Sequence, residues 1–172
     1  MKNILVLRHA KSDHEHGILD FARPLNNRGK IDAPFMGKMI GKLGLTPDLV
    51  LSSGAKRARS TAIAVAEQCG YANEITYLDS FYNGNEEDIF RAVKELPDKY
   101  SSVLIVGHNP TLEDFIAKLT SNGSFSLELP TTGLAHITCG TEHWNKIEHG
   151  IGMLSSFVNP KLLQAIANNI SE

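Results

Sequence analysis

Three runs of consecutive aliphatic residues, each ending abruptly in small or polar residues, constrain the fold of this 172-residue chain most strongly. They are ILVLRH at 4–9, DLVLSS at 48–53 and VLIVGH at 103–108. A strand with one face in water alternates apolar and polar residues, whereas a strand covered on both faces is apolar throughout. The runs therefore predict central strands of a mostly parallel sheet that has helices on both sides.

The segments between and after these runs have the apolar spacing and the end signals of helices. Helices are predicted at 28–44, 57–70, 85–96 and 109–120, with a last one starting near Pro160. Gly44 and Gly70 can cap the first two, and Pro110 suits a first helical turn. Pro34 lies inside the first helix, where it is expected to kink the helix or to shift its start.

Two further strands are predicted at 74–78 and 133–140, and a partner for the second of them at 143–149. GTEH, between the last two, has the composition of a hairpin turn, so this edge of the sheet is expected to be antiparallel. The alternation of strands and helices predicts a three-layer α/β/α sandwich with a mostly parallel central sheet. Residues 1–172 are long enough to bury one core, and we expect a single domain.

The composition excludes several classes of protein. A formal net charge of -2 without a long basic run gives no electrostatic footprint for nucleic acid. No apolar run approaches the roughly 20 residues that span a bilayer, and the N-terminus lacks the pattern of a signal peptide. Cys69 and Cys139 match no metal-ligand spacing and are expected to be core thiols in a reducing compartment. We therefore expect a cytoplasmic protein.

Arginines and histidines follow the ends of the three apolar runs. Arg8 and His9 end the first run, Arg57 comes shortly after the second, and His108 ends the third. Alone, each is better explained as a surface ion pair or a structural histidine. Because the carboxyl ends of parallel strands share one edge of the sheet, the four together predict one cationic pocket, with no carboxylate among them. Arginine forks and helix N-termini suit a dianionic phosphoryl group.

Four motifs resemble those of the histidine phosphatase superfamily, which has a phosphoglycerate mutase-like fold, and in particular its SixA-like phosphohistidine phosphatase branch. They are LVLRHAKS at 5–12, DFARPLNNRG at 20–29, LSSGAKRARSTA at 51–62 and VGHNP at 106–110. The resemblance implies a phosphatase without metal or cofactor that forms a covalent phosphohistidine on His9. Arg8, Arg57 and His108 would then hold the phosphoryl oxygens.

The chemistry of histidine agrees with this role. With a reference pKa of about 6.5, histidine is largely neutral at pH 7, and neighbouring arginines lower that pKa further. A backbone carbonyl that accepts the other ring N–H would fix the tautomer, but the sequence does not identify it. Ser12, Arg23 and Asn109 are further candidates for contact with the substrate. Ser12 could instead cap a turn, and Arg23 could instead pair with Asp20.

The chain departs from the family pattern at several positions. Ala10 replaces a frequent glycine, and Gly54 replaces a frequent proline, which should loosen the loop that presents Arg57. The acid that protonates the leaving group in larger members aligns with Ser80, which leaves Asp79 as the candidate. An alkoxide needs such an acid, whereas a phosphorylated imidazole leaves readily without it. The substitution therefore favours phosphohistidine as the substrate.

Three functions remain open from the sequence. The first is a phosphatase acting on phosphohistidine protein, and the second is an enzyme acting on a small phosphorylated metabolite, by hydrolysis or by mutase chemistry. The third is a non-catalytic module that binds a phosphorylated partner, although phosphate binding alone would not require His9. HEH at 14–16 invites a metal site, but a solvated loop explains it better. The oligomeric state is undetermined, and a monomer is compatible with the sequence.

Overall fold

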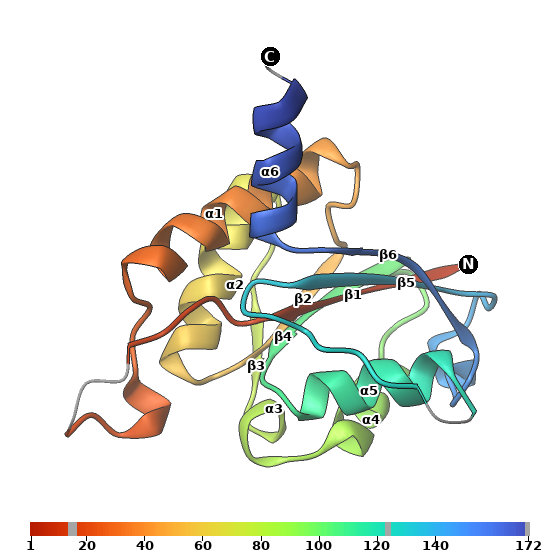
Figure 1. Cartoon of the computed structure of the whole chain (residues 1–172). Helices are drawn as coiled ribbons and strands as arrows, with labels where there is room; N and C mark the ends of the chain where they lie inside the picture. The colour runs from red at the N-terminus through yellow and green to blue at the C-terminus, as the bar shows by residue number, and fades with distance from the viewer. Residues whose placement is uncertain (14–16, 123–124, 171–172) are drawn as a thin grey trace.

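A six-stranded sheet forms the middle layer of the protein, for which the computed structural model describes residues 1–13, 17–122 and 125–170 (Figure 1). The spatial order of the strands is β3-β2-β4-β1-β5-β6. Their bounds are β1 (Lys2–Arg8), β2 (Leu49–Ser53), β3 (Thr76–Leu78), β4 (Ser102–Gly107), β5 (Leu134–Cys139) and β6 (Gly152–Val158). The pairs from β3 to β1 are parallel, whereas β5 runs antiparallel to both β1 and β6.

Helices cover both faces of this sheet, which confirms the predicted α/β sandwich (Figure 1). The helices are α1 (Asn27–Lys42), α2 (Lys56–Cys69), α3 (Ser80–Asn83), α4 (Glu86–Lys94), α5 (Thr111–Thr120) and α6 (Pro160–Ile170), with short 3-10 helices η1 (Asp20–Ala22) and η2 (Trp144–Lys146). In the part of the chain that the structure describes, no helix is both long and apolar enough to cross a membrane.

The central strand β1 shows why its sequence is apolar throughout. Ile4 and Val6 belong to the core that also contains the buried residues of α4 and α5, whereas Leu5 and Leu7 belong to the core under α1 and α2. All four are at most 1% exposed. Successive strand residues point to opposite faces, so both faces of β1 contribute burial worth about 1.5–3 kcal/mol per large aliphatic side chain.

The helix boundaries follow local signals. The Asn26 side chain accepts a hydrogen bond from the Gly29 amide at 2.9 Å and caps α1, which continues past Pro34, so this proline does not move the helix start. Gly70 has a φ of 81° and ends α2, as its position in the sequence predicted. Cys69 and Cys139 are buried free thiols.

One predicted strand is wrong. Residues 143–149 contain η2, and the antiparallel partner of β5 is β6 (Gly152–Val158), so GTEH is not a two-strand hairpin turn. The reason is Trp144, which is fully buried and donates from its indole Nε1 to the Tyr100 carbonyl at 2.8 Å. This anchors the segment to the loop before β4 and leaves the next apolar segment to pair with β5. The predicted antiparallel edge itself is confirmed.

Candidate active site

The carboxyl ends of β2, β4 and β1 lie side by side and bring the predicted cationic residues together. Arg8 is in register with Gly107, so His9 and His108 leave neighbouring strands, with ring centroids 5.0 Å apart. A cavity of about 180 Å³ opens here, which we call the cationic cup. Its lining residues are Arg8, His9, Lys11, Ser12, Arg23, Arg57 and Thr131.

His9 is held with one defined tautomer. Its Nδ1 lies 2.8 Å from the Ala10 carbonyl oxygen, and because a carbonyl can only accept, Nδ1 carries the proton. The lone pair therefore belongs to Nε2. Burial, together with His108 and Arg57, lowers the pKa of His9 to about 3 despite the hydrogen bond to Ala10, so the ring is neutral at pH 7. Ala10 is the carbonyl that the sequence could not identify.

His108 is neutral for a similar reason. Burial and then the charge of Arg57 lower its pKa to about 4. Its Nε2 lies 2.9 Å from the Ser53 hydroxyl oxygen, at the end of β2. Its Nδ1 is buried and has no hydrogen-bond partner among the described residues. A buried polar atom without a partner costs about 1–3 kcal/mol. His108 itself is not among the residues that line the cup, although its ring lies next to that of His9.

The two arginines are fixed by backbone carbonyls. Arg8 Nη1 donates to the Leu129 carbonyl at 2.9 Å, while its Nε is buried without a partner in the described part of the chain. Arg57, only 7% exposed, stands in the first turn of α2 and donates from Nη1 to the Asp20 carbonyl at 2.6 Å. Both guanidiniums are therefore held rigidly where they line the cup.

The expectation that no carboxylate stands among these cations is wrong. Arg57 Nη2 lies 3.0 Å from Oδ2 of Asp20, and Arg23 Nη1 lies 2.7 Å from Oδ1. Although burial alone would raise the pKa of Asp20, hydrogen bonds from Tyr82, Arg57 and Arg23 lower it to about 2. The sequence could not show this contact, because η1 returns to the strand ends only through the folding of the segment after β1.

The pairing of Arg23 with Asp20 is confirmed, whereas contact of Arg23 or Ser12 with the substrate stays a prediction. Arg23 pairs with Asp20, yet it also lines the cup and donates from Nη2 to the Ser12 hydroxyl at 2.7 Å. Ser12 is buried, lines the cup and forms an isolated bridge with Leu25. The segment that carries Arg23 is thereby attached to the segment that carries His9.

Asn109 has a different environment from the one expected of a substrate ligand. Its side-chain amide donates to the Glu113 carboxylate at 2.6 Å and to the Leu129 carbonyl at 2.9 Å. It therefore holds the same carbonyl that Arg8 uses, and its direct contact with substrate stays a prediction. Asp79 precedes α3, where its backbone carbonyl accepts from the Tyr82 amide. His14 and His16, of the HEH segment, lie outside the described residues.

Residues 130–133 contribute to the cup, although no sequence motif predicted it. Thr131 lines the cup, and the Thr132 amide donates to the carbonyls of Arg8 at 3.1 Å and His9 at 3.3 Å. Thr132 has a φ of 59°, an unusual conformation for a β-branched residue. Because β5 is antiparallel to β1, its amino end meets the carboxyl end of β1. Residues that follow strands predict a site at this edge, whereas PTTG precedes a strand.

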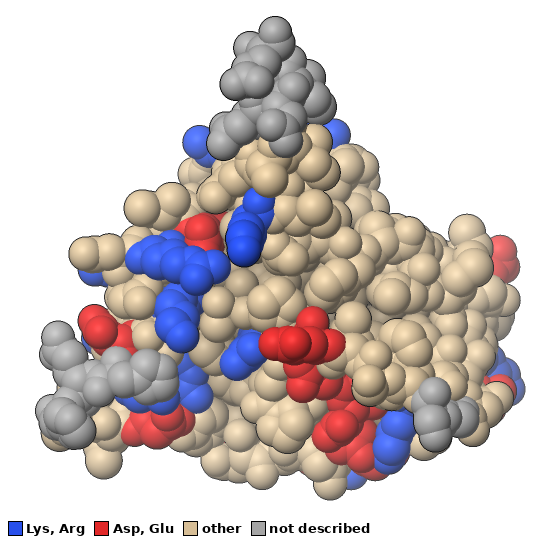
Figure 2. Space-filling model, in the orientation of Figure 1, with Lys and Arg blue, Asp and Glu red and all other residues tan. Residues whose placement is uncertain are grey.

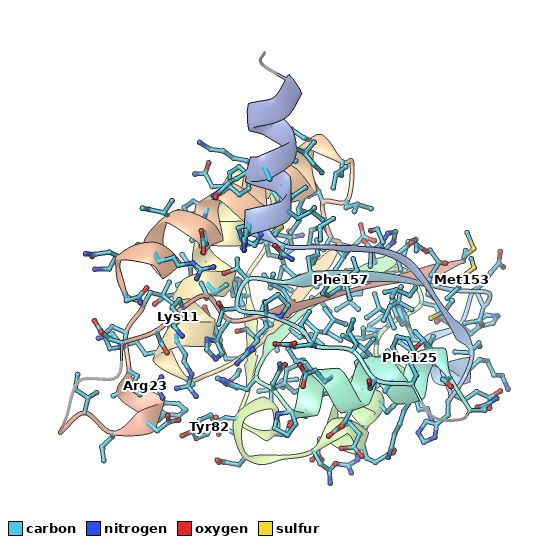
Figure 3. The ribbon with its side chains drawn as sticks, viewed as in Figure 1. Lys11, Arg23, Tyr82, Phe125, Met153 and Phe157 are labelled. Atoms are coloured by element: carbon cyan, nitrogen blue, oxygen red, sulfur yellow. The ribbon has the colours of Figure 1, made fainter. Side chains whose placement is uncertain are left out.

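Charge is unevenly distributed around the cup. Lys and Arg side chains gather over the region of η1 and the start of α1, and acidic side chains form a separate group toward α4 and α5 (Figure 2). Figure 3 shows Lys11, Arg23 and Tyr82 at the same corner of the molecule. The positive charge needed for an anion is thus local, as a near-neutral chain requires.

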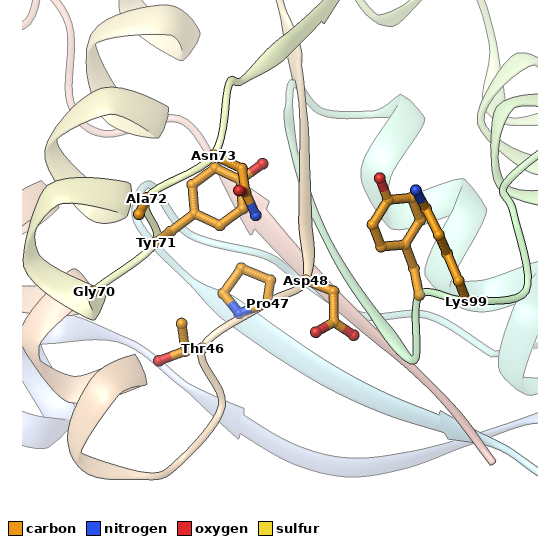
Figure 4. Close-up of a pocket in the computed structure, with 9 residues that line it drawn as sticks. Thr46, Pro47, Asp48, Gly70, Tyr71, Ala72, Asn73 and Lys99 are labelled. Carbon is orange, nitrogen blue, oxygen red and sulfur yellow. The ribbon is translucent and has the colours of Figure 1, made fainter.

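A second, larger cavity of about 490 Å³ lies near the amino ends of the parallel strands (Figure 4). Its lining includes Asp48, whose carboxylate accepts hydrogen bonds from the Ser101 and Ser102 amides at 2.7 and 2.9 Å. Lys99 packs over the ring of Tyr100. These polar groups are hydrogen-bonded to backbone amides or packed against a neighbouring ring, so they do not form a reactive cluster.

Comparisons with known proteins agree with this geometry. No protein-family model matches the chain. An uncharacterized protein of Mycobacterium tuberculosis is 30% identical over 163 residues, which cover 90% of this chain and all of that protein. The structure of a putative phosphohistidine phosphatase SixA from Agrobacterium tumefaciens is 29% identical, with a TM-score of 0.75 over 92% of this chain and 98% of that one. The chain belongs to the histidine phosphatase superfamily.

Within this superfamily the chain resembles the SixA branch. The structure of the protein histidine phosphatase SixA complexed with tungstate matches 94% of this chain and 99% of that one, with a TM-score of 0.82 and 20% identity. The resemblance expected from the four sequence motifs is therefore confirmed at the level of superfamily and fold.

Proposed function

We propose that the chain is a phosphatase that acts on phosphohistidine protein through a covalent phosphohistidine on His9. The observation that carries this proposal is a neutral imidazole, with its lone pair on Nε2, in one cup with two fixed guanidiniums. A phosphate-binding module would need only the arginines. A nucleophilic nitrogen beside them indicates covalent chemistry.

In the first step, His9 Nε2 attacks phosphorus and forms a new P–N bond while the bond to the leaving group breaks. Arg8 and Arg57 stabilise the charge on the phosphoryl oxygens, which takes the place of a metal ion in this reaction. The Nδ1 proton stays on His9 and on its hydrogen bond to the Ala10 carbonyl. The positive charge that develops on the ring is thereby partly compensated.

In the second step, water attacks the phosphorus of the phosphorylated His9. The P–N bond breaks and its electron pair returns to Nε2, while both water protons leave on the product as H₂PO₄⁻, which can release one of them to solvent. We expect His108, whose ring centroid lies 5.0 Å from that of His9, to donate from Nδ1 to a phosphoryl oxygen in both steps. This role requires that the Ser53 hydroxyl donates to His108 Nε2. The sequence of steps replaces one difficult displacement by two easier ones.

The charge of Asp20 supports phosphohistidine over a phosphomonoester as the substrate. With a pKa of about 2, this carboxyl group is ionised at pH 7 and carries no proton for an alkoxide. A protonated phosphoimidazole needs none, because it leaves as neutral imidazole. We therefore expect faster turnover of phosphohistidine protein than of phosphomonoesters such as glycerol phosphate.

Replacement of His9 tests the covalent route. Wild type quenched in the presence of ³²P-labelled phosphohistidine protein should carry label that is stable to base and labile to acid, and His9→Ala should carry none. His143→Ala is the matched control, because His143 pairs with Asp98 outside the cup. Hydrolysis by His9→Ala at the wild-type rate would show that the nucleophile is assigned wrongly. Turnover confined to one phosphomonoester would favour a metabolite phosphatase instead.

A further inference from the structure

We propose that Asp20 recognises the leaving group, by accepting a hydrogen bond from the imidazole nitrogen that does not carry phosphorus. This inference rests on the proposed function and adds to it the residue that selects a phosphorylated imidazole. Asp20 would then contact the substrate directly, in addition to holding Arg57.

Asp20 is both fixed and accessible. Its Oδ2 accepts from Arg57 Nη2 at 3.0 Å and from the Tyr82 hydroxyl at 2.9 Å, and its Oδ1 accepts from Arg23 Nη1 at 2.7 Å. The side chain is nevertheless 51% exposed, whereas that of Arg57 is 8% exposed. The carboxylate is therefore the solvent-exposed partner of a guanidinium that lines the cup.

The carboxylate has room for one more donor. An ionised carboxylate offers about four acceptor positions, and these three contacts from described residues occupy three of them. The remaining position is on Oδ1. A ligand N–H that reaches it would form a charge-assisted hydrogen bond, which is about twice as strong as a neutral one.

Two aromatic rings lie next to the Asp20 carboxylate. Phe21 neighbours Asp20 in η1, is 44% exposed and lies edge-on to Tyr82, with ring centroids 5.0 Å apart. The Tyr82 ring also lies 5.6 Å from that of His108. A flat ring that enters beside Phe21 and Tyr82 would bury apolar surface while its N–H points to the carboxylate. A sugar or glycerol leaving group has no such flat ring.

The proposed contact favours the reactive form of the substrate. A phosphoimidazole breaks its P–N bond readily when the other ring nitrogen is protonated, since the electron pair then returns to a ring that leaves as neutral imidazole. The proton stays on that nitrogen throughout, and His9 Nε2 takes the phosphoryl group. An anionic acceptor at Asp20 stabilises the protonated ring, and it does nothing for a leaving alkoxide or phenoxide.

The test compares two substrates in one variant. For Asp20→Asn, kcat/KM for phosphoimidazole should fall at least about ten-fold more than kcat/KM for p-nitrophenyl phosphate, as the loss of one charged hydrogen bond predicts. Asp20→Glu keeps the carboxylate and should restore part of the selective loss. Asp114→Asn, the matched control, makes the same change at an exposed position of α5 outside the cup, so the ratio between the two substrates should stay near the wild-type value.

An equal fall for both substrates would overturn the proposal, because it would show that Asp20 only holds Arg57. Such a result leaves the proposed function intact, since wild type still hydrolyses phosphoimidazole through His9. Absence of wild-type activity on phosphoimidazole would instead refute the proposed function and this inference with it. Circular dichroism of each variant confirms that the ratios refer to folded protein.

Discussion

The two ends of the parallel strands differ in how their polar groups are satisfied. At the amino ends, the Asp48 carboxylate is matched to the amides of Ser101 and Ser102, and the cavity there is the larger one. At the carboxyl ends, Arg8 Nε and His108 Nδ1 are buried without partners among the described residues. Under the proposed function the smaller cavity is the active site, so cavity size is a poor guide to it. The better guide is a set of polar groups that is held in place but incompletely paired.

Removal of Arg57 should have the largest effect on the site at the carboxyl ends of the strands. Arg57→Ala takes away a buried guanidinium at the phosphoryl site, and we expect kcat to fall about 10³-fold, as for the loss of a strong oxyanion donor. The affinity for tungstate, measured by calorimetry, should fall as well. Arg59→Ala is the matched control, because Arg59 lies on the same helix but packs over Tyr77. Unchanged kcat in Arg57→Ala would remove the cup from the mechanism.

The two neutral histidines should make stability depend on pH. Their pKa values in the folded protein are about 3 for His9 and about 4 for His108, because burial disfavours the charged ring, while both return toward 6.5 on unfolding. The stability that goes with the neutral rings is therefore fully present above pH 6.5 and is lost as the pH falls below that value. Between pH 7 and pH 5 the free energy of unfolding should decrease by about 2 kcal/mol for each histidine.

Urea titrations at several pH values measure this effect. The double variant His9→Gln and His108→Gln should show a flatter dependence than wild type over the same interval. If both proteins lose stability equally between pH 7 and pH 5, the histidines are not buried in neutral form, and the contrast between the two ends of the sheet would be weaker than described.

A smaller effect is expected at Ser53, which holds His108. Ser53→Ala removes the hydroxyl 2.9 Å from His108 Nε2 and leaves that nitrogen unpaired, so kcat should fall about ten-fold. Ser52→Ala is the matched control, since Ser52 is equally buried and its hydroxyl donates to the Ser53 carbonyl. Equal losses in both variants would point to a general effect on the end of β2 and not to the orientation of His108.

Much of the fold could be predicted from the chain because its signals are local. A strand covered on both faces is apolar throughout, so β1, β2 and β4 were found, and glycine after a helix identified the end of α2. The strand predicted at 143–149 was wrong, and the residue responsible is Trp144. Trp144 is buried in the core and donates to the carbonyl of Tyr100, a residue 44 positions away, and no local pattern carries that information.

The sequence by itself predicted that Arg8, His9, Arg57 and His108 lie at one edge of the sheet, because residues that follow parallel strands leave them at the same edge. The order of the strands, which makes β2, β4 and β1 neighbours, came from the tertiary structure. Only the tertiary structure decided that Asp20 and Thr131 join them. Asp20 arrives on η1, which folds back onto Arg57, and Thr131 arrives at the amino end of an antiparallel strand. Periodicity places the residues of one strand or helix, whereas the return of a loop depends on long-range contacts.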